Sequence, residues 1–94
     1  MNDEQQDTPA WIYRSSRKDE MYLYLAAEED FGPVPEALMH RFGQPLFVME
    51  LELNQQRQLA REDVLKVIRN LRENGFHLQM PPTLVPELYH GNED

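Results

Sequence analysis

Alternation of apolar and polar side chains over residues 46–53 is the feature that most limits what this chain can fold into. The apolar positions are Phe47, Met49, Leu51 and Leu53, and between them stand Val48, Glu50 and Glu52. Successive side chains of an extended chain point to opposite sides, so every second residue shares one face. We therefore predict a strand over residues 46–53 with one face in the core and the other in water.

Three further segments have the pattern of strands. Residues 10–15 and 21–26 are rich in aromatic and branched side chains, and the charged tract of residues 16–20 between them is typical of a hairpin. Residues 76–80 alternate again, and we expect Phe76, Leu78 and Met80 to point inward while His77 and Gln79 point outward. Two prolines follow at positions 81 and 82 and end the strand, because proline cannot donate to a ladder.

Two segments have the periodicity of helices. Residues 35–42 begin with a proline, which fits the first position of a helix, and Gly43 follows as a residue that can end it. Residues 61–74 carry apolar side chains at positions i, i+3, i+4 and i+7, and Gly75 stands at the expected C-terminal end. The apolar stripe of this longer helix consists of Val64, Val67, Ile68 and Leu71.

The order of elements is therefore strand, strand, helix, strand, helix, strand. Strand-helix-strand units cross over right-handed, whereas a hairpin pairs antiparallel. We predict an α+β fold of two layers: a mixed four-stranded sheet with both main helices on one face and the other face partly open. Residues 10–82 form this single domain, residues 1–9 a disordered acidic tail and residues 83–94 a variable C-terminal tail, in which residues 86–89 are a candidate for a short helix.

Composition excludes several classes of protein. The chain has no cysteine, so it can form neither a disulfide nor a cysteine-ligated metal site. Its apolar runs, such as residues 46–49, are far too short to span a bilayer, and its acidic, polar N-terminus is unlike a signal peptide. We expect a soluble cytoplasmic protein without a membrane partner.

The charge is acidic, with 17 Asp and Glu against 9 Lys and Arg. Six of the acidic residues lie near the two ends of the chain, so the body is nearly neutral. Acidic tails repel other polyanions, and nucleic-acid binding by simple electrostatics is therefore disfavoured.

The turn of the predicted hairpin gathers cations and hydroxyls, and we call it the basic hairpin. Its members are Arg14, Ser15, Ser16, Arg17 and Lys18. Guanidinium, ammonium and turn N–H groups together could bind a phosphate or a carboxylate, which makes this the best candidate for anion or partner binding. The plainer interpretation, which we favour, is a solvated turn whose charges discourage edge pairing.

Aromatic residues give a second candidate surface. Tyr13, Tyr22, Tyr24 and His77 could share the sheet face that the helices leave open, as stacking platforms do in readers of single-stranded RNA. Ordinary cross-strand packing explains the same tyrosines, and we favour it. A third surface is the basic stripe of Lys66, Arg69 and Arg72 on the longer helix, which could dock an acidic partner or simply be solvated.

Signals for catalysis, metal binding or a cofactor are missing from the sequence. The histidines at positions 40, 77 and 90 have no paired spacing, the serines lack a glycine elbow, and four glycines form no phosphate loop. We assign no catalytic residue, no metal ligand and no cofactor.

Several short pieces of the sequence, taken in order, resemble the YcgL-domain family of small bacterial proteins. The pieces are Tyr13-Arg14-Ser15-Ser16-Arg17-Lys18, Tyr22-Leu23-Tyr24, Val34-Pro35 with Leu38, Phe42-Gly43-Gln44-Pro45, Leu59, Val67, Gly75-Phe76-His77-Leu78-Gln79 and Pro81-Pro82. The resemblance covers residues 10–82 and implies a small α+β bacterial protein. It carries over no activity and no catalytic residues.

By exclusion, we predict a non-enzymatic protein-interaction module that binds an unidentified protein partner through an exposed sheet edge or the open face. The alternative is an RNA accessory protein that uses the basic hairpin with the aromatic face. An enzyme ranks third, because it would need a concave site with convergent polar groups.

Overall fold

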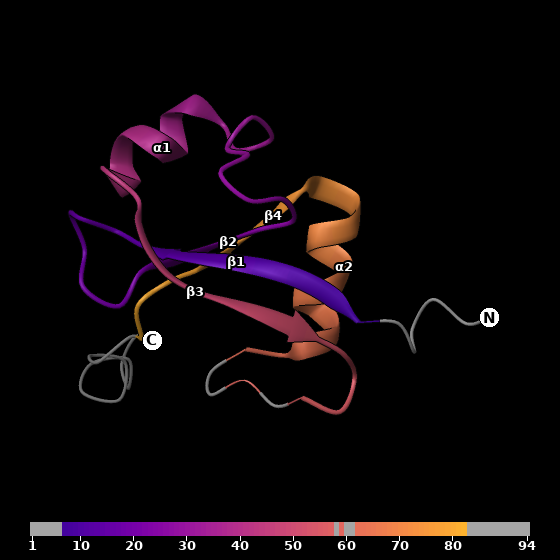
Figure 1. The fold of residues 1–94 in the computed structure, drawn as a ribbon. Coiled ribbons are helices and arrows are strands. Elements are labelled where there is room, and N and C mark those ends of the chain that lie inside the picture. The colour runs from indigo at the N-terminus through magenta and orange to yellow at the C-terminus, as the bar shows by residue number, and fades with distance from the viewer. Residues whose placement is uncertain (1–6, 58, 60–61, 83–94) are drawn as a thin grey trace, which may run out of the picture.

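The computed structural model describes residues 7–57, 59 and 62–82 of the 94-residue chain. Most of the two predicted tails, including the candidate helix at residues 86–89, lies outside the described residues. The elements are β1 (Thr8–Arg14), β2 (Tyr22–Leu25), α1 (Glu36–Phe42), β3 (Leu46–Leu53), α2 (Val64–Asn74) and β4 (Phe76–Gln79) (Figure 1). The predicted α+β class, the four strands, the two helices and their order are confirmed.

The sheet has the strand order β3-β1-β2-β4, and every neighbouring pair is antiparallel. The prediction of a mixed sheet was wrong. Strands β2 and β3 do run in the same direction, but β1 lies between them, and the connection through α2 leads from one edge of the sheet to the other. No two parallel strands therefore become neighbours, and β3 and β4 form the two edges.

The ends of the elements follow local chemistry. Strand β1 begins at Thr8, two residues before the predicted start, and Pro9 is tolerated there because β2 pairs with β1 only from Trp11 onward. Helix α2 begins at Val64, three residues later than predicted, where the Asp63 carboxylate caps it by accepting the N–H of the residue at position 65 (3.1 Å). Gly75 ends α2 in the left-handed conformation, at φ 87°, as predicted.

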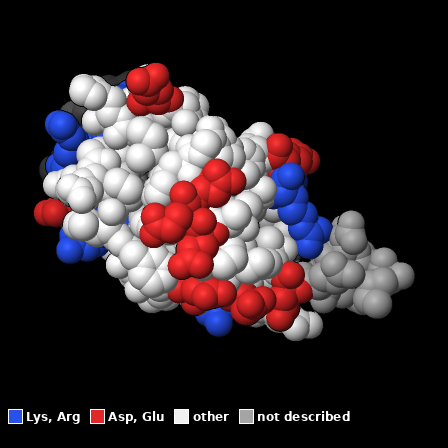
Figure 2. Space-filling view, turned by 45° about the horizontal axis from the view of Figure 1, so that its top comes forward, with Lys and Arg blue, Asp and Glu red and all other residues white. Residues whose placement is uncertain are grey.

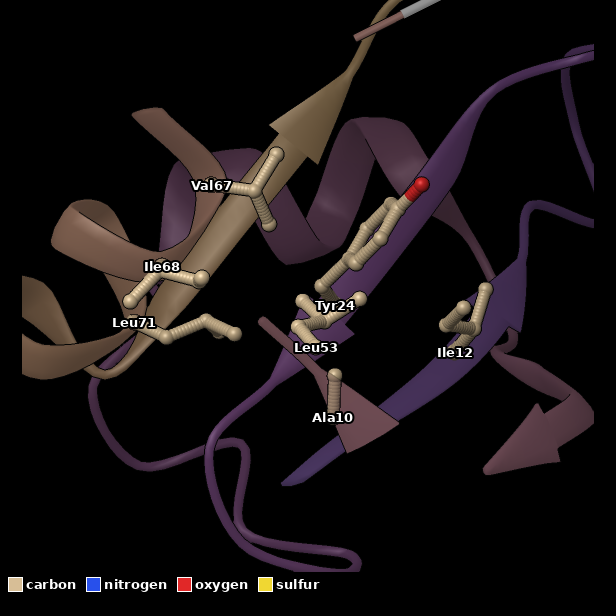
Figure 3. Packing of buried hydrophobic residues seen from close by; sticks show 7 residues of the cluster. All are labelled: Ala10, Ile12, Tyr24, Leu53, Val67, Ile68 and Leu71. Atoms are coloured by element: carbon tan, nitrogen blue, oxygen red, sulfur yellow. The ribbon is translucent and has the colours of Figure 1, made fainter. Parts of the chain in front are cut away.

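Each face of the sheet has its own hydrophobic core. Helix α2 covers a cluster of Ala10, Ile12, Tyr24, Leu53, Val67, Ile68 and Leu71 (Figure 3). The opposite face packs a second cluster of Tyr13, Met21, Leu23, Leu25, Val34 and Phe42, which includes the last residue of α1. The helices stand at opposite ends of the sheet in Figure 1.

The predictions of two layers and of both helices on one face were therefore wrong. Strands β1 and β2 are apolar on both sides: Ile12 and Tyr24 face one way, Tyr13 and Leu23 the other. A nearly continuous apolar run is typical of a strand that is buried on both faces, so each face needs its own cover. One helix on each side provides that cover.

Strand β3 departs from the simple alternation predicted for it. Met49 stands beside Ile12, but Phe47 stands beside Tyr13, and the shift in register leaves Val48 without a partner in β1. Such a bulge turns the following side chains to the other face. Phe47 therefore lies on the same face as Glu50, and Met49 lies on the opposite face. The prediction that Phe47 and Met49 point inward was wrong, because both side chains are exposed.

Candidate functional site

The two hydroxyls of the basic hairpin bind the protein itself. Ser15 is 5% exposed; its Oγ donates to the carbonyl of Phe42 and accepts the backbone N–H groups of Arg17 (2.9 Å) and Lys18 (3.0 Å). The Oγ of Ser16 accepts the N–H of Gln44 at 2.7 Å. The turn N–H groups that an anion would need at this serine are thus already used, and the hairpin is fastened to the C-terminal end of α1.

Close packing at Gly43 reinforces this junction. The residue lies at φ 82° and ψ −151°, a region that is open almost only to glycine. A Cβ atom there would stand 2.5 Å from the Oγ of Ser16 and 2.6 Å from the Cγ of Arg17. The three cations of the hairpin, at positions 14, 17 and 18, remain exposed around this rigid turn.

The four aromatic candidates do not share a face. Tyr24 stands beside Ile12 and His77, in the core under α2, where Tyr22 packs half-buried. Tyr13 belongs to the opposite cluster. The structure therefore brings three of the four together, but beneath a helix rather than on an open face.

Tyr13 is held tightly on its side of the sheet. It is 2% exposed, and its ring meets those of Phe31 and Phe47 edge to face at centroid distances of 5.0 and 5.5 Å. Its hydroxyl oxygen accepts the N–H of Glu29 at 3.1 Å. Burial, which penalises the phenolate, raises the pKa of Tyr13 above its ordinary value.

A polar network lies beneath α2, where the sequence led us to expect outward side chains. His77 and Gln79 were predicted to point into water, but they are 5% and 8% exposed because α2 covers that side of β4. Gln79 accepts the Tyr24 hydroxyl at 2.9 Å. His77 Nδ1 lies 2.9 Å from the Asn70 amide nitrogen, and its Nε2 lies 2.7 Å from a Glu62 carboxylate oxygen.

The side chains of this network form hydrogen bonds with one another. When the Asn70 amide donates to Nδ1, the hydrogen of a neutral His77 ring sits on Nε2 and is donated to Glu62. Both ring nitrogens are then occupied. The arrangement joins the N-terminal end of α2 to β4 and holds polar groups in a core without leaving them unsatisfied.

The outer edge of β3 is different, because most of the side chains of this strand are exposed. Phe47, Val48 and Met49 are 56%, 38% and 44% exposed, and in the described residues no strand pairs with the outer side of β3. We call these three residues the edge patch. This patch was not predicted, because the alternation assigned Phe47 and Met49 to the core and only Val48 to the wet face, although the four consecutive apolar residues at positions 46–49 were the available signal.

Acidic side chains accompany the edge patch. Glu50 and Glu52 are exposed on β3 itself. Figure 2 shows Asp and Glu side chains gathered on one broad face and along its lower margin, with Lys and Arg at the sides. Beside Glu50 and Glu52 an anion meets repulsion, whereas a cationic partner is attracted.

Beside α2 lies a shallow groove with a different character. Its lining consists of Gln55, Leu65, Ile68, Arg69, Arg72 and Glu73. Arg72 donates to the Thr8 hydroxyl at 3.0 Å, so part of the predicted basic stripe serves to hold the start of β1. Leu65 is 47% exposed at this groove.

Among the described residues, no group of three or more His, Asp or Glu side chains is placed to hold a metal ion. No helix in the described part of the chain has the length and hydropathy needed to cross a membrane.

Comparison with known proteins places these features in a family. The YcgL domain matches residues 10–82. A YcgL domain-containing protein of Pseudomonas paraeruginosa is 56% identical over 71 residues, which is 76% of this chain and 73% of that protein. One of Thioalkalivibrio sulfidiphilus is 50% identical over 72 residues, covering 77% of this chain and 89% of the relative. The match takes in the basic hairpin, both helices and the whole of β3 and β4.

Proposed function

The chain belongs to the YcgL domain family, and we propose that this domain is a non-enzymatic protein-interaction module that binds its partner through the outer edge of β3. The cytoplasmic location expected from the sequence is part of the same proposal. Cell fractionation with an antibody against the protein would check the location.

The edge patch is the observation that carries the proposal. Three consecutive large apolar side chains in water are a liability on a strand whose outer side pairs with no other strand in the part of the chain that the structure describes, because such an edge pairs readily with other chains. An edge of this kind is the surface that strand addition uses: main-chain hydrogen bonds supply affinity and neighbouring side chains supply selectivity. We therefore assign the patch to binding.

The other edge of the sheet, strand β4, is a poorer surface for the addition of a strand. Strand β4 has four residues against eight in β3, and each of its side chains is buried or half-buried. Short edge strands are one of the ways in which proteins prevent pairing. This contrast is why the proposal concerns β3.

Two serines and a histidine that could act in catalysis already form hydrogen bonds within the protein. Ser15 and Ser16 bind backbone groups, and His77 binds two side chains. This supports a non-enzymatic role. The alternative of an RNA accessory protein loses its aromatic face, since Tyr13 and Tyr24 lie in different cores. Of the two surfaces it relied on, the exposed cations of the basic hairpin remain.

The test is partner capture by the full-length chain, compared between two matched variants. Val48→Lys places a charge in the edge patch at a position without a β1 partner, and Leu65→Lys places the same charge at a side chain of α2 that is also exposed, 47% against 38% for Val48. We expect the wild type and Leu65→Lys to recover the same stoichiometric protein from bacterial extract, and Val48→Lys to lose it. Circular dichroism confirms that each variant is folded. Retention of that partner by Val48→Lys, or recovery of none by the wild type, would refute the proposal.

A further inference from the structure

We infer that the occupant of the β3 edge is an extended segment of another protein in which Lys or Arg alternates with aliphatic residues. The inference rests on the proposed function, since it names the partner that the same edge would accept. It follows from the two faces of β3, from the charge of the chain and from the rules that govern neighbouring strands.

The faces of β3 differ in chemistry over residues 49–52. Cross-strand partners share a face, and Glu50 stands beside Trp11 while Glu52 stands beside Pro9. The acids therefore line one side of the edge. Met49 and the residue at position 51 stand beside Ile12 and Ala10 and line the other side.

An added strand continues both faces. Side chains directly opposite each other on paired strands interact, and opposite charges or paired aliphatic groups stabilise the pair. The residues placed beside Glu50 and Glu52 would thus be cationic, and those beside Met49 and Leu51 would be aliphatic. Because the side chains of the added strand also alternate, these requirements combine into one pattern, cation-aliphatic-cation-aliphatic, over four residues.

A second copy of this chain fits the edge poorly. Two β3 strands paired antiparallel about Glu50 would place that acid opposite its own copy, and pairing about Leu51 would place Glu50 opposite Glu52 twice. Like charges directly opposite destabilise a pair. The net charge of −8 adds repulsion between whole chains. The same acids repel the phosphates of a nucleic acid.

The bulge strengthens the case for a selective edge. Val48 has no β1 partner, and the register shift puts exposed Phe47 on the acidic face. Bulges and charges on edge strands suppress indiscriminate pairing. An edge that combines a bulge and acidic side chains with exposed apolar side chains disfavours most added strands and accepts those in which cations alternate with aliphatic residues.

The experiment titrates synthetic extended peptides into the full-length protein at low salt and follows binding by anisotropy and β3 protection by hydrogen exchange. The test peptide contains Lys-Val-Lys-Val. The controls are Glu-Val-Glu-Val, which reverses the charge, and Lys-Lys-Val-Val, which keeps the composition but loses the alternation. We expect the test peptide to protect residues 46–53 and to bind about five- to tenfold more tightly than either control, with a difference that shrinks as salt is added.

Charge reversal on the protein provides the matched variant. Glu50→Lys/Glu52→Lys should exchange the preference, so that Glu-Val-Glu-Val binds more tightly. Glu28→Lys/Glu73→Lys changes the net charge equally at exposed acids elsewhere and should leave the preference for the cationic peptide in place.

The outcomes separate the two claims. If no peptide of any charge protects β3, the proposed edge itself is wrong. If peptides protect β3 but the charge preference is missing or fails to invert, the edge stands and the cationic partner is refuted. Protection of β3 by dimerisation in sedimentation, or by single-stranded RNA, would likewise overturn this inference.

Discussion

Replacement of Ser15 by alanine should destabilise the protein strongly, because one buried hydroxyl serves three backbone groups. The Ser15 Oγ donates to the carbonyl of Phe42 and accepts the N–H groups of Arg17 and Lys18. Alanine fills the space of the methylene but leaves all three groups without this partner. The carbonyl is the costly one, since its bond is buried, whereas the two N–H groups are partly open to water.

The size of the effect follows from these contacts. A buried group left unsatisfied costs about 1–3 kcal/mol, and a bond that water can replace costs about 0.5 kcal/mol. Together, one buried carbonyl and two N–H groups predict a loss of about 2–4 kcal/mol in the free energy of unfolding. For a domain of this size the melting temperature should fall by about 10–30 °C.

Urea denaturation followed by circular dichroism, with Ser16→Ala as the matched control, measures this loss. Ser16 is exposed and accepts a single N–H group, so its replacement should cost about 0.5 kcal/mol. If Ser15→Ala unfolds at the same urea concentration as Ser16→Ala, the hydroxyl is not a structural centre of the hairpin. The assignment of Ser15 to fold rather than to anion binding would then fail.

Two further predictions concern the same side of the sheet. Gly43→Ala should lower the free energy of unfolding by about 1–3 kcal/mol, because alanine is strained at φ 82° and its Cβ would meet Ser16 and Arg17; a urea midpoint equal to that of the wild type would contradict this. Tyr13 has a raised pKa when folded, so above pH about 10 the unfolded chain releases this proton first and stability falls as the pH rises toward the folded pKa. Tyr13→Phe should make that alkaline loss shallower in denaturant melts between pH 9 and about 11, and an unchanged slope would show that burial of this phenol does not contribute.

Local chemistry made much of the fold predictable. The order of the six elements depends on periodicity and on helix-ending residues, both of which act within a few positions of the chain. Gly75 ends α2 in the left-handed conformation that glycine adopts at little cost. Gly43 likewise ends α1, although the close approach of Ser16 and Arg17 there could not be seen in the sequence.

The candidate surfaces were harder to predict, because they depend on what covers each face. The basic hairpin was correctly placed at the turn from β1 to β2, but the Ser15 hydroxyl also donates to the carbonyl of Phe42, which lies 27 positions away in the chain. His77 and Gln79 looked like solvent-facing residues because they alternate with Phe76 and Leu78. Their burial requires α2 to lie on that side of β4, and the alternation itself is the same whichever side is covered.

By itself the sequence determined which residues share a face in the regular stretches of strand and helix, where most of the elements end, and which family the chain resembles. Only the tertiary structure decided that the two helices lie on opposite faces, that a bulge at Val48 turns Phe47 away from Met49, and that β3 lies at an open edge. The physical reason is that side-chain periodicity is set by backbone geometry within one segment, whereas strand order and cover are set by contacts between segments far apart in the chain.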